Sequence, residues 1–192
     1  MDKNRVMAFT DAIIAIAATI MVLEMKVPDV GLSMTNLLEL VPIFFAYTVS
    51  LFLIYFAWRS HHNAFQKADV LTTDTYLING IWLFLLTLVP FGTGVFGRYP
   101  NSNLAAFLYV GIVFLWTFSF QFLDASIVKN NPTAQKDEVM HPMARLILFG
   151  GFGLAFLSIL IHPFMAFIIL AVSNVLMVIR ILHEKKKSSE LN

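Results

Sequence analysis

Six apolar segments, each long enough to cross a lipid bilayer, constrain the fold of this chain more than any other feature of its sequence. A membrane-spanning helix needs about 20 predominantly apolar residues, and polar or turn-forming residues separate the candidate segments. We place them at residues 7–26, 36–60, 71–96, 103–128, 143–161 and 163–183. The sequence therefore predicts an all-α, polytopic membrane protein with six transmembrane helices.

The composition supports this interpretation. Only 13% of the residues are charged, against about 25% in a soluble domain, so a water-facing surface cannot be built. The absence of cysteine excludes disulfides, thiolate metal sites and a cysteine nucleophile. The first apolar run continues through Leu23 and is too long for the core of a signal peptide. We therefore expect it to be a retained first span.

The basic residues predict the orientation, because cytoplasmic loops of membrane proteins are enriched in lysine and arginine. With a cytoplasmic N-terminus, only Lys26 and Arg98 of the 13 basic residues lie outside. The residues placed inside are Lys3, Arg5, Arg59, Lys67, Lys129, Lys136, Arg145, Arg180, Lys185, Lys186 and Lys187. Both termini should be cytoplasmic, with residues 1–183 forming one transmembrane domain and residues 184–192 a polar cytoplasmic tail.

The first span opens with a polar motif, R-x-x-x-F-T-D, formed by Arg5, Phe9, Thr10 and Asp11. Ionisable residues in membrane spans are candidates for function. In isolation they would also fit a structural role, with Asp11 accepting from free helix amides and Arg5 reaching the lipid head groups.

This motif and the following AIIAIAATIMVLEM resemble the R-x-x-x-F-S-D signature and pore helix of potassium-permeable channels related to the lysosomal potassium channel, the transmembrane protein 175 family. The stretches WRSHHNAF (58–65) and LLTLVPF (85–91) are also similar to that family. Thr10 replaces the usual serine and keeps its hydroxyl.

The resemblance implies a potassium-permeable cation channel in the bacterial plasma membrane. It implies a homotetramer, since bacterial members have four subunits, and a first helix that lines the pore. The expected partners are the lipid bilayer and monovalent cations, with no nucleic acid. We expect no cofactor beyond the permeant potassium ions, no metal site and no catalytic residue.

One face of the first helix is the candidate pore lining. With Ile16 at zero, helical spacing puts Ile20 at about 40°, Leu23 at about 340° and Thr19 at about 300°. Every face of this helix is apolar, so periodicity alone does not select one. The resemblance implies a hydrophobic constriction at Ile16, Ile20 and Leu23, with the Thr19 hydroxyl as a polar layer for selectivity.

Asp11 falls at about 220°, away from that face, and we expect it to anchor the first helix to its neighbours. Its expected network contains Arg5, Thr10 and one of three residues near the end of the second span. The sequence does not decide among these three, His61, His62 and Asn63. The role of Arg5 is open as well, because its angle of about 340° is on the pore side.

The main alternative is a secondary transporter or proton-coupled carrier. Such proteins favour charged residues and broken helices near mid-membrane. The candidate carboxylates, Glu24, Glu39, Asp74 and Asp124, are placed near span ends, and only Pro42 and Pro90 hint at a break.

Two further signals are weak. The segment TGVFG (93–97) has the composition of a potassium-filter loop but the wrong order. A membrane enzyme or metal site lacks support, because the sequence has no nucleophile–base pair and no H-x-x-x-H motif.

Overall fold

The computed structural model describes residues 2–26, 31, 33–134 and 141–190, with side chains given through His183. Six helical segments in these residues are long and apolar enough to cross a membrane, and each overlaps a predicted span. The largest difference is in the second, which continues to Gln66. The predicted all-α architecture with six membrane-spanning segments is confirmed.

In chain order the described elements are α1 (Lys3–Ile20), the 3₁₀ helix η1 (Met21–Glu24), α2 (Met34–Leu38), α3 (Val41–Gln66), α4 (Thr73–Thr87), α5 (Val89–Arg98), α6 (Asn103–Asn130), α7 (Pro142–Ile159) and α8 (Pro163–Glu190). Side chains cap several of these starts. Asp2 accepts a hydrogen bond from the Asn4 amide at 2.9 Å, and Thr72 accepts one from the Thr75 amide at 3.3 Å. Such caps satisfy amides that have no partner in the first helical turn.

The second and third spans each consist of two helices. Pro42 lies in the first turn of α3, and Pro90 lies in the first turn of α5. Proline has no N–H and cannot continue a preceding helix, although a first turn tolerates it. The third span is therefore interrupted at Leu88, between α4 and α5. Pro42 and Pro90 are only hints of a break in a sequence where no broken helix is evident, and the interruption at Leu88 corrects that expectation.

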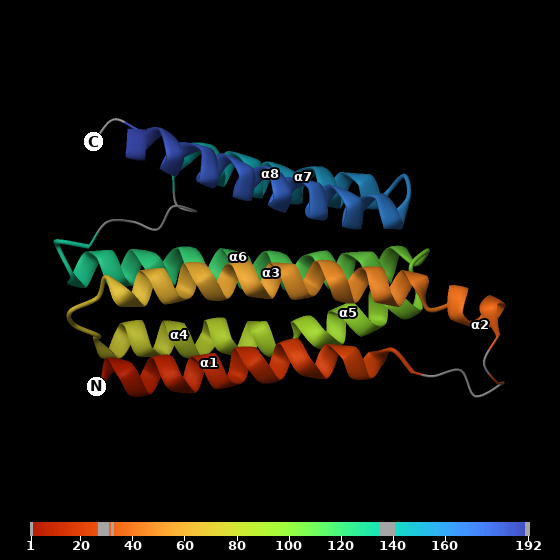
Figure 1. The fold of residues 1–192 in the computed structure, drawn as a ribbon, viewed down its shortest axis with the longest axis horizontal. Coiled ribbons are helices and arrows are strands. Elements are labelled where there is room, and N and C mark those ends of the chain that lie inside the picture. Colours follow the sequence, from red (N-terminus) through yellow and green to blue (C-terminus); the bar gives the residue numbers. More distant parts are fainter. Residues whose placement is uncertain (1, 27–30, 32, 135–140, 191–192) are drawn as a thin grey trace.

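The helices pack along a common direction, with the α7–α8 hairpin against α6 and α3 (Figure 1). Phe167 of α8 joins the hairpin to the rest of the core. Its ring centroid lies 5.0 Å from that of Phe96 in α5 and 5.3 Å from that of Tyr109 in α6. Aromatic side chains thus form part of the contact between the hairpin and the remaining helices, and Arg145 Nε of α7 adds a hydrogen bond to Gln121 Oε1 of α6 at 3.0 Å.

Two glycines set close helix approaches. A Cβ added to Gly97 of α5 would lie 2.8 Å from the Cα of Ile43 in α3. A Cβ on Gly151 of α7 would lie 2.5 Å from the Cβ of Ser173 in α8. Both distances are shorter than side-chain atoms permit, so the two helix pairs depend on glycine at these positions.

A buried hydroxyl cluster joins α3, α5 and α6. The Thr93 hydroxyl donates to Ser50 Oγ at 2.8 Å, and Ser50 Oγ lies 3.0 Å from the Tyr109 hydroxyl. Because a buried hydroxyl without a partner is costly, these bonds stabilise the packing of α5 beyond the break at Leu88.

The start of α1 and the end of α8 lie at the same end of the bundle (Figure 1). At this end, Lys3 Nζ donates to the Ala68 carbonyl at 2.7 Å. Asn131 Oδ1 accepts from the amides of Asp69 and Val70, both at 2.8 Å. These bonds fix the loop between α3 and α4 against α1 and the end of α6.

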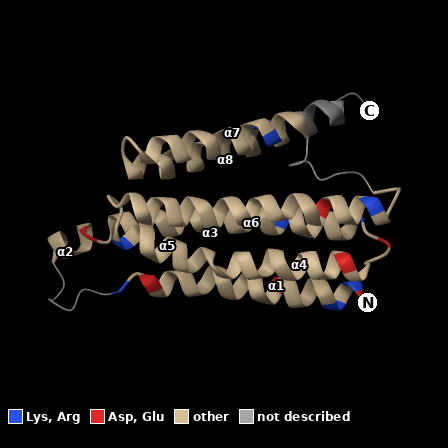
Figure 2. Cartoon of the chain, turned by 180° about the vertical axis from the view of Figure 1, so that it is seen from behind, with Lys and Arg blue, Asp and Glu red and all other residues tan. Residues whose placement is uncertain are grey.

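The described lysine and arginine side chains concentrate at the end where α1 begins (Figure 2). Lys26, which follows η1, and Arg98, in the last turn of α5, lie toward the other end. Lys136 and the side chains of Lys185, Lys186 and Lys187 lie outside the described residues. The cytoplasmic assignment of this end stays a prediction from charge. The domain boundary after residue 183 also stays a prediction. The helix α8 itself continues to Glu190.

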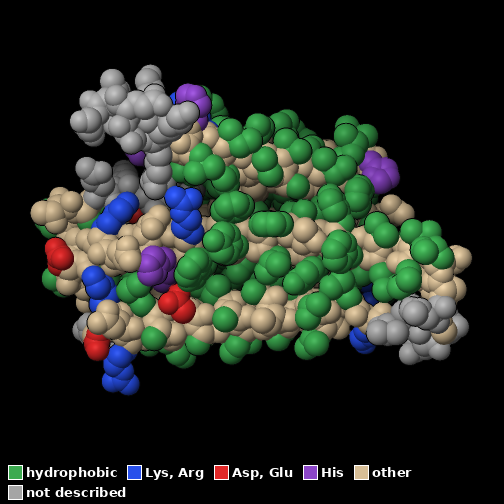
Figure 3. Space-filling view, in the orientation of Figure 1, with side chains coloured by type: hydrophobic (Ala, Val, Ile, Leu, Met, Phe, Trp, Pro, Cys, Tyr) green, Lys and Arg blue, Asp and Glu red, His purple; other side chains and the backbone are tan. Residues whose placement is uncertain are grey.

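Hydrophobic side chains cover the middle of the molecular surface, and charged side chains gather toward its ends (Figure 3). Many large apolar residues are exposed on several helices, among them Phe84, Leu104, Leu157 and Ile161. A lipid environment accepts such a surface, whereas water would not. The exterior agrees with a membrane protein.

Candidate functional site

The helix α1 buries one stripe of residues against the rest of its own chain. These residues are Val6, Thr10, Ile14, Ala17 and Met21. With Ile16 at zero, they occupy angles of about 80° to 160°. The packing of a single chain therefore uses one side of α1 and leaves the opposite side uncovered.

The predicted constriction residues lie on that uncovered side. Ile16 is 58% exposed, Ile20 42% and Leu23 71%. The α-helix ends at Ile20, and η1 continues the chain in 3₁₀ geometry. Residues i and i+3 eclipse one another in a 3₁₀ helix, so this change keeps Leu23 close to the direction of Ile20.

Thr19 lies between the constriction residues and is also exposed. Its hydroxyl donates to its own helix, with Oγ1 lying 2.9 Å from the Ala15 carbonyl and 3.0 Å from the Ile16 carbonyl. Because the hydroxyl proton points back to the backbone, the lone pairs of Oγ1 are available on the outer side. This is the orientation in which a hydroxyl coordinates a cation.

Asp11 is half-buried and contacts α3. Its Oδ1 accepts a hydrogen bond from Trp58 Nε1 at 2.9 Å. A hydrogen bond to a carboxylate is about twice as strong as one between neutral groups. Asp11 thus joins α1 to α3, although through a residue that the sequence analysis had not placed in the network.

A second connection runs from α1 through α4 to α3. Asn79 Nδ2 donates to Thr10 Oγ1 at 3.1 Å, and Asn79 Oδ1 lies 2.8 Å from His61 Nε2. The amide oxygen carries no proton, so His61 Nε2 is the donor of this bond. Thr10 is 0% exposed and His61 1% exposed, which places the connection inside the core.

Comparison with known proteins identifies the family. The model of the family described as "Endosomal/lysosomal potassium channel TMEM175" matches residues 5–90. A protein named potassium channel from Chamaesiphon minutus is 37% identical over 120 residues, which are 58% of this chain and 59% of that protein. A second potassium channel, from a Chryseobacterium species, is 33% identical over 130 residues, or 67% of each chain. The chain belongs to the TMEM175 family.

A crystal structure of a lysosomal potassium-selective channel TMEM175 homolog from Chamaesiphon minutus has the same fold as this TMEM175 protein. The TM-score is 0.80 at 28% identity, covering 93% of this chain and 97% of the other. The resemblance noted from the R-x-x-x-F-T-D motif is confirmed. The segment that matches the family model contains α1 from Arg5 onward and the residues of both connections to it.

The other predicted network residues of this TMEM175 protein lie apart from these two connections. Arg5 and Phe9 are exposed on α1, on the same side as Ile16. His62 Nε2 lies 2.8 Å from Gln66 Nε2, within α3 itself. Among the three residues left open by the sequence, the described structure connects His61 to Thr10, and it connects none of them directly to Asp11.

Trp58 and Asn79 are the network residues that sequence reasoning missed. Both are uncharged, whereas ionisable residues are the stronger signal of function within membrane spans. Asn79 offered a signal nevertheless, because it is an amide inside the apolar run YLINGIWLFLL. A buried amide needs hydrogen-bond partners, and in this structure it supplies the link between α1 and α3.

The two weak sequence signals have simple structural explanations. Residues 93–97 form part of the helix α5, where Thr93, Gly94, Phe96 and Gly97 are buried. Their carbonyls are therefore engaged in a helix rather than arranged as a filter loop. Among the described residues, no group of three histidine or carboxylate side chains is placed to hold a metal ion.

Proposed function

We propose that this TMEM175 protein is a potassium-permeable cation channel of a bacterial plasma membrane. The observation that carries the proposal is the side of α1 that its own chain leaves uncovered, where large aliphatic residues flank one hydroxyl. The names of the two bacterial relatives support potassium as the permeant ion.

A single copy of α1 cannot enclose a path for an ion. We infer that α1 helices from several subunits meet on a common axis, and that the assembly is a homotetramer. The exposure of Ile16 and Leu23 supports this, since the other described residues of the chain leave most of both side chains uncovered. The buried stripe on the opposite side holds each α1 to its own subunit.

The constriction would act as a hydrophobic barrier. Rings of Ile16, Ile20 and Leu23 exclude water when they are close together, so an ion there meets a large dehydration cost. A small widening admits a partly hydrated cation. Potassium releases water more easily than sodium, and the outward lone pairs of Thr19 replace part of that water.

A carrier is the second candidate, because the interruption of the third span at Leu88 resembles the discontinuous helices of transporters. However, the hydroxyls of Ser50, Thr93 and Tyr109 beyond this break bond to one another, and the Thr87 hydroxyl before it donates to its own helix. The Glu24 carboxylate packs against Gly94, farther along α5, rather than at Leu88. The hydroxyls at the break offer no charge for a coupled substrate. The channel is therefore favoured.

Ion flux from liposomes that contain the purified protein tests the proposal. We expect potassium to move down its gradient without any coupled solute, at a rate that rises with the gradient without saturating. Flux that saturates, or that requires a second solute, would identify a carrier. Liposomes with the protein that conduct no cation at all would contradict both functions.

Thr19→Val tests the hydroxyl layer, since the two side chains are close in shape and only the oxygen is lost. We expect the permeability ratio of potassium to sodium to fall about two- to tenfold, the range that corresponds to one hydrogen-bonding group of 0.5–1.5 kcal/mol. Reversal potentials measure this ratio.

Thr87→Val is the matched control, because Thr87 is also exposed and also donates to its own helix, but in α4. It should leave the ratio unchanged. An unchanged ratio in Thr19→Val would mean that pore size alone determines selectivity.

A further inference from the structure

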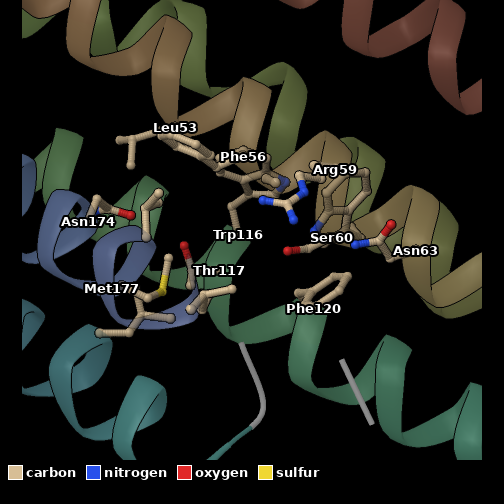
Figure 4. A pocket seen from close by; sticks show the side chains of 15 residues that line it. Leu53, Phe56, Arg59, Ser60, Asn63, Trp116, Thr117, Phe120, Asn174 and Met177 are labelled. Carbon is tan, nitrogen blue, oxygen red and sulfur yellow. The ribbon is translucent and has the colours of Figure 1, made fainter. Parts of the chain in front are cut away.

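A pocket lies away from α1, between α3, α4 and α6 on one side and the α7–α8 hairpin on the other, with a cavity volume of about 70 Å³ (Figure 4). Arg59 and Ser60 of α3 line it together with Trp116 and Thr117 of α6 and Asn174 of α8. Arg59 precedes the end of α3 by seven residues, or roughly 10 Å of helix. The pocket is thus near the basic end of the bundle.

The polar groups of this pocket favour an anion. The Arg59 guanidinium and the Ser60 hydroxyl point into the space between α3 and α6 (Figure 4). Among the lining residues Arg59 is the charged one, and no carboxylate is present. Within the described part of the chain, neither Arg59 nor Ser60 has a side-chain hydrogen-bond partner.

A second observation points to a missing acceptor. Trp116, which also lines the pocket, is 2% exposed, and its indole Nε1 has no hydrogen-bond partner among the described residues. Asn174 Nδ2 donates to the Leu170 carbonyl at 2.8 Å. A buried donor without an acceptor is costly, so a ligand with several oxygen acceptors would stabilise this region.

The remaining walls are apolar, with Leu53, Phe56, Leu148, Met177 and Val178 among them. A ligand that fits both the polar groups and the apolar walls of the pocket has an anionic head and a hydrocarbon chain. We propose that this pocket binds an anionic phospholipid, with the phosphate held by Arg59 and Ser60 and the start of an acyl chain against α3 and α8.

The location supports a lipid from the bilayer as the source of the phosphate. Arg59, Ser60 and Asn63 are half-buried, so the polar side of the pocket is reached from the surface of the chain. The basic end that the sequence places in the cytoplasm faces the leaflet in which anionic lipids attract lysine and arginine. A soluble phosphate ion would satisfy the donors but would leave the apolar walls uncovered.

Native mass spectrometry of the full-length protein in detergent tests the proposal without any ion flux. The probes are phosphatidylglycerol, phosphatidylcholine with the same acyl chains, and inorganic phosphate. We expect bound phosphatidylglycerol to persist where phosphatidylcholine dissociates. Arg59→Gln should weaken phosphatidylglycerol binding at least tenfold, because it removes charge-assisted hydrogen bonds. Arg59→Lys keeps the positive charge but loses the planar guanidinium that can donate two parallel hydrogen bonds to a phosphate. It should weaken binding less than Arg59→Gln.

Lys129→Gln is the matched control, since Lys129 is an exposed basic residue near the same end and outside the pocket. The affinity of this variant for phosphatidylglycerol should stay within twofold of the affinity of the parent protein. Equal weakening in Lys129→Gln and Arg59→Gln would indicate a general attraction of charge and would overturn the site. Inorganic phosphate that displaces the lipid at equal concentration would overturn the lipid as the occupant.

A photoactivatable phosphatidylglycerol gives a measurement on the unaltered sequence, in case Arg59→Gln does not fold. Peptide mapping should place the cross-links in residues 53–60, 116–120 and 174–181, the segments that line the pocket. Cross-links spread evenly over the exposed apolar surface, with no enrichment in these segments, would contradict the proposal.

Discussion

Replacing Ile16 with asparagine is expected to raise the resting potassium flux at least tenfold. Ile16 is exposed on the side of α1 opposite to its buried stripe, and in the proposed tetramer one copy from each subunit narrows the path. Each amide would offer a permeating ion or water a hydrogen-bonding group of about 0.5–1.5 kcal/mol. Because 1.36 kcal/mol changes a rate tenfold, several such groups together lower the barrier substantially. Flux into liposomes at equal protein density measures the effect.

The same substitution should reduce the preference for potassium, because a hydrated constriction no longer forces ions to lose water. Ile179→Asn is the matched control. It introduces the same amide in place of an exposed isoleucine on α8, outside the first span. Its flux should stay close to that of the parent. If Ile16→Asn assembles normally and conducts like the parent protein, Ile16 is not the barrier.

The six spans could be predicted because their signal is long and strong. A run of about 20 apolar residues permits few alternatives to a membrane helix, and the polar segments between the runs set their approximate ends. The positions of helix breaks within a span were harder to predict from the sequence. Pro42 and Pro90 look alike in the sequence, but only the break before Pro90 has two long flanking helices, α4 and α5.

The orientation of α1 could not be read from periodicity, because nearly every position of the helix is apolar. Burial supplies the missing information. Thr10, Ile14 and Ala17 contact the chain's own core, while Ile16 and Leu23 do not. The structure thus removes one side of the helix from consideration as a pore lining. The sequence identified the other side only through the family resemblance.

The polar network shows a different limit of sequence reasoning. The motif predicts a polar network around Thr10 and Asp11, and in the described residues each has a hydrogen bond to another helix. The partners themselves are uncharged and distant in sequence, with Trp58 47 residues and Asn79 69 residues away. Which neutral side chain reaches a given position depends on helix rotation and packing, and neither leaves a local pattern.

Asp11→Leu is expected to destabilise the assembled protein by about 1–3 kcal/mol, the cost of leaving a hydrogen-bonding partner unsatisfied. The partner in question is Trp58, whose indole N–H donates to Asp11 at 2.9 Å. The proposed anchoring role predicts that α1 then loosens from α3 and that the oligomer dissociates at a temperature several degrees lower. Asp11→Asn keeps an acceptor oxygen without the charge, so its effect should be smaller.

Trp58→Phe separates this anchoring role from direct coordination of the permeant ion. It leaves the Asp11 carboxylate in place and removes the indole donor together with part of the ring, so an anchor should again loosen while an ion ligand would remain functional. If the two groups act through one bond, combining Trp58→Phe with Asp11→Leu should cost less than the sum of the single changes. Asp69→Asn, at an exposed carboxylate near the same end of the bundle, is the control and should alter neither stability nor conductance. An Asp11→Asn oligomer that keeps its full thermal stability but has lower single-channel conductance would assign Asp11 to the ion path, and the anchoring role would have to be abandoned.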